Sequence, residues 1–148
     1  MIKIRQYSYF ALYSETMTAA DMTVHLSMEP DEIRVLGSRS AEHRLPRSHS
    51  WQIHRHSPES IDEQIEYLID RLTPVLPRLL SLIDRPDVGA SMQVVRHYDD
   101  PDGVHGAPGG TSLADVHNWP RPLGWHLTTA VLEFLVATGA ELDIDEYN

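Results

Sequence analysis

Two histidines that could bind a metal ion stand close together near the middle of the chain. His54 and His56 are two residues apart in the segment Ser-Trp-Gln-Ile-His-Arg-His, whose alternation predicts a strand with both imidazoles on one face. A pair of imidazoles can supply two ligands to zinc or a similar ion. A third ligand could come from His97, Asp99 or His105. The alternative is that these are ordinary surface histidines in a chain that has nine.

Other reactive motifs are weak. The run Asp-Asp-Pro-Asp-Gly at 99–103 resembles a calcium loop, but Tyr98 stands where the EF-hand pattern requires an acid, and the bidentate glutamate is missing. The sequence has no Gly-x-Ser-x-Gly motif and no cysteine. A pair of carboxylates for acid–base catalysis stays open. We therefore predict no cofactor and no catalytic residue, although an enzyme is not excluded.

An aromatic surface is predicted on the side of the sheet that the two main helices leave open. Phe10 and Leu12 alternate with tyrosines in the first strand, so the tyrosines should point away from the core. The residues expected on this side are Tyr7, Tyr9, Tyr13, His54, His56, Met92, Val94 and Tyr98. Such a face could serve self-association or bind a small ligand. The alternative is that the last helix or the long loop covers it.

Two tryptophans close a long tract, residues 99–125, that is rich in glycine, proline and aspartate. Structureless loops of this length are uncommon and are often functional. Trp119 and Trp125 are expected to pack back onto the body and hold the loop. Otherwise they are exposed anchors for a partner, because tryptophan is enriched among interface hot spots.

The strands that must position these residues follow from two-residue alternation. They are predicted at residues 5–13, 32–36, 50–56, 88–98 and, alternating Leu142 and Ile144 with Asp143 and Asp145, at the end of the chain.

Three helices are predicted from apolar residues at helical spacing and from their capping residues. The first begins at Thr18 and ends before Pro30. The second begins at Ser60, which forms a capping box with Glu63, and should be broken near Thr73 by two prolines. The third runs over 128–138 and ends at a glycine.

The resulting order, β-α-β-β-α-β-α-β, predicts an α+β fold. Its first six elements have the order of a ferredoxin-like split βαβ unit, followed by an appended helix and a C-terminal strand in a mainly antiparallel sheet. At 148 residues, we expect a single domain.

Composition limits the classes of partner. The net charge of −10 disfavours nucleic acid, whose binding requires that phosphates be neutralised. No apolar run approaches the roughly 18–20 residues of a membrane helix, and the basic start has no apolar run behind it, so we expect neither a membrane segment nor a signal peptide. These features, with the lack of cysteine, favour a cytoplasmic protein.

A series of short segments resembles one bacterial family. They are Tyr-Phe-Ala-Leu-Tyr at 9–13, Glu-Pro at 29–30, Ser-Trp-Gln-Ile at 50–53, Leu-Thr-Pro at 72–74 and Gly-Ala-Glu-Leu-Asp-Ile-Asp-Glu-Tyr at 139–147. In this order they are similar to domain of unknown function 4279 (DUF4279), over nearly the whole chain. The resemblance supports the fold and implies no activity, ligand or catalytic residue. The long 99–125 loop departs from the family pattern.

The sequence thus favours a non-catalytic binding or interaction module whose partner is a protein, either a second copy in a homodimer or a different chain. One concrete form is an immunity-type protein that neutralises a toxin. The expected contact residues are Tyr7, Tyr9, Tyr13, Trp119 and Trp125. The alternative is a small-molecule or metal-dependent enzyme or sensor, with His54, His56, His97 and Asp99 gathered beside the long loop.

Overall fold

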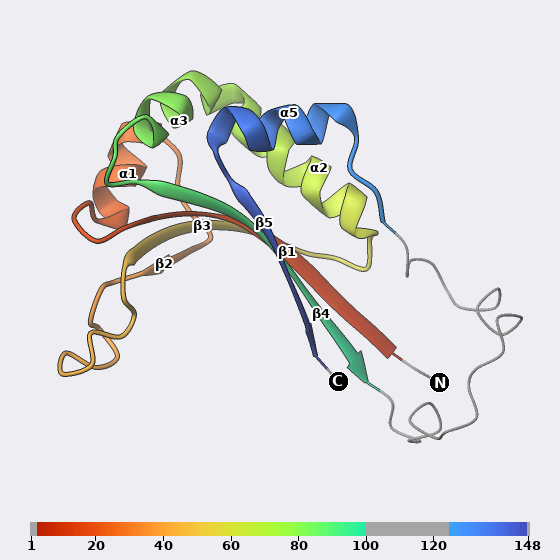
Figure 1. Cartoon of the computed structure of the whole chain (residues 1–148), viewed down its shortest axis with the longest axis horizontal. Coiled ribbons are helices and arrows are strands. Elements are labelled where there is room, and N and C mark those ends of the chain that lie inside the picture. Colours follow the sequence, from red (N-terminus) through yellow and green to blue (C-terminus); the bar gives the residue numbers. More distant parts are fainter. Residues whose placement is uncertain (1–2, 100–124, 148) are drawn as a thin grey trace, which may run out of the picture.

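Strand and helix segments alternate along the chain and build an α+β fold. A computed structural model describes residues 3–99 and 125–147 (Figure 1). Its strands are β1 (Lys3–Ser14), β2 (Glu32–Arg34), β3 (His49–His56), β4 (Gly89–Asp99) and β5 (Glu141–Tyr147). Its helices are α1 (Ala19–Leu26), α2 (Ile61–Leu72), the 3₁₀ turn η1 (Thr73–Val75), α3 (Leu76–Ile83) and α5 (Thr129–Thr138). Each predicted strand and helix is confirmed, with small shifts at the ends.

The strands form one five-stranded sheet in the order β2-β3-β1-β4-β5. The pairs β2–β3, β3–β1 and β1–β4 are antiparallel, whereas β5 runs parallel to β4. The prediction of a mainly antiparallel sheet is therefore confirmed. The central strand, β1, pairs with a neighbour along both of its edges.

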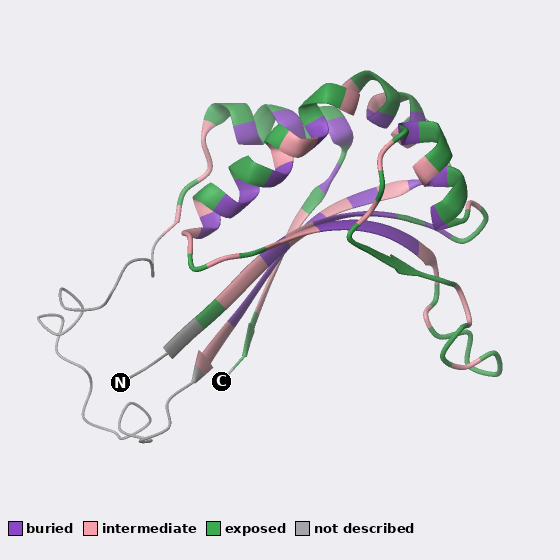
Figure 2. Cartoon of the chain, turned by 180° about the vertical axis from the view of Figure 1, so that it is seen from behind, coloured by how far each residue is buried: buried purple, intermediate pink, exposed green. Residues whose placement is uncertain are grey.

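The described helices cover one face of this sheet (Figures 1 and 2). Phe10 and Leu12 of β1 point into the core under them, and both are fully buried. The last helix, α5, joins the same layer, since Phe134 meets Phe10 edge to face with ring centroids 5.9 Å apart. The opposite face of the sheet, called here the open face, is therefore not covered by α5.

The register of β4 corrects one prediction about the open face. Met92 and Val94 are fully buried in the core, because they lie beside Phe10 and Ser8 of β1 on the side that faces the helices. Tyr98 follows at the same two-residue spacing and so lies on that side too. Alternation separates the two sides of β4 but does not say which one meets the core, and the prediction that placed these three residues on the open face is wrong.

Capping residues set the helix ends as predicted. The hydroxyl groups of Thr18 and Thr128 accept hydrogen bonds from backbone N–H groups in the first turns of α1 and α5. Ser60 and Glu63 form the complete capping box at the start of α2. The prolines that follow α2 convert its continuation into η1 and then α3, which confirms the break near Thr73. None of the described helices combines the length and apolar character needed to cross a bilayer.

A buried glutamine fastens α2 to the central strand. Gln64 is fully buried, and its Oε1 accepts a hydrogen bond from the Ser8 hydroxyl at 2.9 Å. Its Nε2 donates to the backbone carbonyls of Gln6, at 3.2 Å, and Ser57, at 2.8 Å. One side chain therefore gives the buried Ser8 hydroxyl an acceptor and binds two partly buried carbonyls, of β1 and of the turn before α2.

Replacing Gln64 with leucine should lower the free energy of unfolding by about 2–3 kcal/mol, because the Ser8 hydroxyl and two carbonyls lose their buried partner. Urea denaturation followed by circular dichroism measures this. Glu66→Gln, on the exposed side of the same helix, is the control and should change the value by less than about 0.5 kcal/mol. A Gln64→Leu loss below about 1 kcal/mol would contradict this role.

Candidate functional site

The open face carries aligned rows of side chains that run across the sheet, as the register of β3, β1, β4 and β5 requires. Successive residues of a strand point to opposite faces, so residues paired across these strands share a face. The first row is His54, Tyr9, Gln93 and Asp143, and the second row is His56, Tyr7, Val95 and Asp145. Aromatic rings therefore lie on the β3–β1 side of the face, and carboxylates lie on β5.

Four rings of these rows form a stacked cluster, called here the ring array: Tyr7, Tyr9, His54 and His56. Across the strands, the ring centroids are 4.6 Å apart for Tyr7 and His56 and 4.8 Å apart for Tyr9 and His54. Along the strands, the separations are 6.4 Å between the tyrosines and 5.5 Å between the histidines. The rings are nearly parallel, with interplanar angles of 8–23°. Offset stacking of this kind restrains the rings against one another.

A chain of hydrogen bonds fixes the orientation of His54. The amide Nε2 of Gln52 donates to the Ser50 hydroxyl at 2.8 Å, so its Oε1 is the atom that lies 2.8 Å from His54 Nε2. The imidazole therefore carries its proton on Nε2 and donates it to Gln52, which leaves Nδ1 as an acceptor. Burial lowers the pKa of His54 below 6.5, an effect that Glu32 opposes and His56 reinforces. His54 is a neutral, oriented ring at neutral pH.

An ion pair links this part of the sheet to the helical layer. The backbone N–H of His54 donates to Asp31 Oδ2 at 2.7 Å, and the Arg71 guanidinium of α2 donates to the same oxygen at 2.6 Å. Burial alone would raise the pKa of Asp31, but these two hydrogen bonds outweigh it and lower the pKa. Burial also raises the pKa of the Tyr9 hydroxyl, so this ring stays neutral.

The predicted contact residues are only partly brought together. Tyr7 and Tyr9 lie in the ring array, half-buried, while Tyr13 lies farther along β1, where its ring crosses Gly89. A Cβ atom at position 89 would come within 2.3 Å of that ring, so the glycine makes room for it. Trp125 packs against the hydrophobic core, as predicted. Trp119 lies outside the described residues.

The predicted metal ligands are described only in part, because the Asp99 side chain and His105 lie outside the described residues. Among the side chains that the structure does describe, no group of three His, Cys, Asp or Glu could hold an ion. His54 and His56 do share a face, but their rings stack on each other and on the tyrosines. His97 instead stacks on Tyr147 of β5, with centroids 5.0 Å apart. The backbone of Asp99 ends β4, and its side chain is outside the description.

Sequence reasoning missed several residues of the open face. Gln93 and Val95 lie between the tyrosines of β1 and the acids of β5, and Gln93 Nε2 donates to Asp145 Oδ2 at 3.0 Å. Leu142 and Ile144 of β5 pack against the core, so Asp143 and Asp145, which alternate with them, point away from it. No sequence signal showed that β5 pairs with β4, which is what places these acids in the same rows as the ring array.

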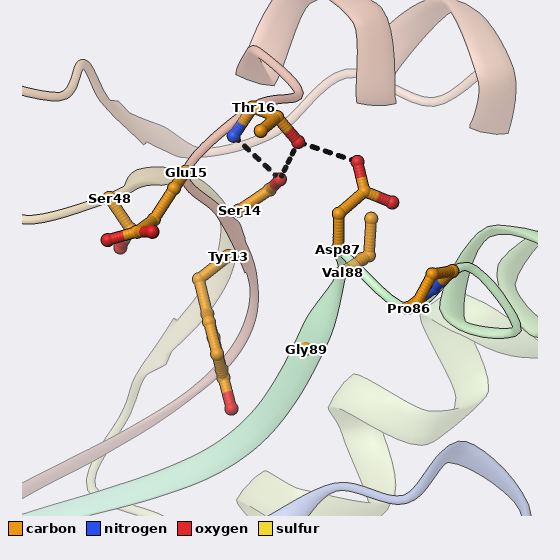
Figure 3. A pocket seen from close by; sticks show the side chains of 9 residues that line it. All are labelled: Tyr13, Ser14, Glu15, Thr16, Ser48, Pro86, Asp87, Val88 and Gly89. Carbon is orange, nitrogen blue, oxygen red and sulfur yellow. Dashed lines mark hydrogen bonds between the residues drawn. The ribbon is translucent and has the colours of Figure 1, made fainter.

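A hollow lies at the end of β1 that leads to α1 (Figure 3). Its volume is about 370 Å³, and it is lined by Tyr13, Ser14, Glu15, Thr16, Ser48, Pro86, Asp87, Val88 and Gly89. The Thr16 hydroxyl donates to Asp87 Oδ2 at 2.6 Å, and the Ser14 oxygen accepts from the backbone N–H groups of Thr16 and Met17. These bonds hold the β1–α1 connection against the α3–β4 connection, which is a structural role.

Asp87 makes this connection sensitive to acid. Hydrogen bonds from Arg85 and Thr16 lower its pKa to about 2, against 3.8 in an ordinary aspartate. A carboxylate whose pKa is lowered by folding stabilises the folded state. This stabilisation is fully present at pH values above the ordinary pKa of 3.8, and it is lost as pH falls from about 4 to about 2. Asp87→Asn should therefore flatten the fall of the unfolding free energy over that range, measured by urea titration at several pH values. Asp84→Asn is the control, and an unchanged slope in Asp87→Asn would contradict the assignment.

The state of His54 can be tested directly by NMR. We expect ¹⁵N chemical shifts of the neutral form protonated on Nε2 and a pKa below 6.5. Glu32→Gln should lower that pKa further, because a nearby carboxylate favours the imidazolium, and His56→Gln should raise it. The Nδ1 tautomer would show that the hydrogen-bond chain does not exist in solution, and a pKa above 6.5 would contradict the burial of the ring.

Comparison with known families agrees with the resemblance found in the sequence. A family model described as "Domain of unknown function (DUF4279)" matches residues 3–148. No curated protein and no solved structure matches the chain.

Proposed function

Because the chain belongs to the DUF4279 family, whose description states no activity, we propose a function from the geometry: a non-catalytic module that binds a protein partner through its open face. The ring array carries this proposal. Tyrosine and histidine rings present an apolar body with a polar edge, and aromatic residues are enriched at protein interfaces. Here two tyrosines and two histidines are held in fixed orientations on a face that none of the described helices covers.

Two of the groups that could do chemistry within the described ranges already have structural partners, which favours binding over catalysis. His54 gives its Nε2 proton to Gln52, and the Ser14 hydroxyl oxygen accepts two backbone N–H groups. The ring array also suits a protein better than nucleic acid. Nucleobases would stack on such rings, but a net charge of −10 repels the phosphates that accompany them.

We also propose that β1 to β4, with α1 and the α2–α3 helices, form a ferredoxin-like split βαβ unit. The order β2-β3-β1-β4 with three antiparallel pairs supports it. In this order, β3 lies between β1 and β2, which α1 connects, and β1 lies between β3 and β4, which α2 and α3 connect. The helix α5 and the parallel strand β5 are then the appended elements. This arrangement places both crossovers on one side and leaves the ring array on the other.

The double variant Tyr7→Ala/Tyr9→Ala should abolish the complex with the protein partner, because both rings lose their contact area. Native mass spectrometry of the untagged protein, purified gently from cells that express it naturally, measures the complex. Hydrogen exchange should show protection in β1 and β3 of the wild type that the variant lacks. Circular dichroism establishes whether the variant is folded, and His56→Ala, at an exposed ring of the same array, provides a second variant.

The matched control is Val24→Ser/Val136→Ser, which changes two exposed apolar residues of the helical layer and should leave the complex intact. A complex that survives the loss of both tyrosines, with no protection in β1 or β3, would exclude the open face as the interface. An immunity-type role is one form of this function, and a stoichiometric complex with a different protein, such as a toxin, would favour it.

A further inference from the structure

We propose that the partner is a second copy of this chain, and that the two open faces pack together about a two-fold axis parallel to the strands, between β1 and β4. This inference rests on the proposed function and names the partner of the same surface. The inference follows from the unequal distribution of histidines and carboxylates over the open face. Histidines lie on β3 and carboxylates lie on β5, at the opposite side of the central pair β1–β4.

The register makes the face complementary to itself. His56 and Asp145 belong to one row across the sheet, and His54 and Asp143 belong to the other. A two-fold rotation about an axis parallel to the strands keeps each row at its own height. Because the axis lies between β1 and β4, the rotation exchanges β1 with β4 and β3 with β5. The histidines of one copy then lie opposite the carboxylates of the other. His56 can donate to Asp145, whereas His54 already gives its Nε2 proton to Gln52 and lies 3.5 Å from Glu32 of its own chain.

The alternative two-fold axis in the plane of the interface, perpendicular to the strands, gives a worse match. That rotation places β5 over β5, so carboxylates meet carboxylates, and β3 over β3, so histidines meet histidines. Like charges that meet in an interface weaken it, whereas opposite ones set its register. Repulsion between the carboxylates of the two β5 strands therefore disfavours the perpendicular axis and selects the axis parallel to the strands. Sheets that pack face to face keep their strands within about 30° of each other, which this axis allows.

The groups at the proposed contact are suited to it. His56 is exposed, and its ring stacks on Tyr7, so it is oriented before any partner arrives. Asp145 accepts from Gln93 through Oδ2, and that bond does not use Oδ1. An imidazole N–H of His56 in the second copy can donate to this oxygen, and symmetry forms the contact twice. The tyrosines of β1 lie opposite Gln93 and Val95 of β4, which side chains of their own copy already bury, so the taller rings supply most of this part of the contact.

The experiment uses two substitutions that each weaken the homodimer and that should restore a dimer when the two variants are combined. His56→Asp sets a new carboxylate against Asp145, and Asp145→His sets a new imidazole against His56. Each variant alone should weaken the dimer about tenfold or more, measured by sedimentation equilibrium. Mixed in equal amounts, the variants should recover a heterodimer. In it, one contact is the original pair of His56 and Asp145, and in the other the imidazole and the carboxylate have exchanged positions. Native mass spectrometry separates the heterodimer from both homodimers after one chain is labelled with ¹⁵N.

The controls carry the same changes away from the open face, as His43→Asp and Glu133→His, both at exposed positions. These should dimerise like the wild type. A wild-type dimer that neither open-face variant weakens, or a mixture that recovers no heterodimer, would overturn the proposed packing. A wild type that stays monomeric would also overturn it. In that last case a complex with another protein, lost in Tyr7→Ala/Tyr9→Ala, would leave the proposed function in place.

Discussion

The two-residue alternation of β1 is the constraint on which the rest of the structure depends. This strand pairs along its length with β3 on one edge and β4 on the other, so its register sets which residues of both neighbours face the helices. Phe10 and Leu12 anchor the core, and Ser8 receives the buried Gln64 of α2. The same alternation sends Tyr7 and Tyr9 to the open face. Core and candidate surface are two sides of one strand, and a slip by one residue would exchange them.

The open face combines aromatic packing with polar restraint. Side chains without a covering layer usually sample several rotamers, and a partner must immobilise them at a cost in entropy. Here ring stacking orients the array, and the bonds from Ser50 to Gln52 to His54 add a directional restraint at its base. Asp31 and Arg71 tie the same part of β3 to α2. Such preorganisation lowers the entropy that is lost on binding. A contact surface formed by few residues therefore needs less interaction energy to bind a partner.

Local signals in the sequence predicted most of the helices and strands. They did not predict how strands that are distant in the sequence pair with one another. Thr18, Ser60, Thr128 and Gly139 mark helix ends because capping acts over three or four residues, and the prolines after α2 act over one turn. The side of β4 that meets the core depends on its register with β1, which is a contact between distant segments. That is why Met92 and Val94 were misplaced. The approach of Asp145 to Gln93 and of His97 to Tyr147 had no local signal either.

The two outer strands of the sheet limit how it can grow. β2 has only three residues, all exposed, and β5 carries acidic residues at Glu141, Asp143, Asp145 and Glu146. Short or charged outer strands discourage the backbone of another chain from adding to a sheet. Continuous β-sheet polymers built edge to edge, including amyloid-like stacks of the folded form, are thereby disfavoured. The acids of β5 thus disfavour growth of the sheet at its edge, and on the open face Gln93 and Val95 of β4 separate two of them, Asp143 and Asp145, from the tyrosines.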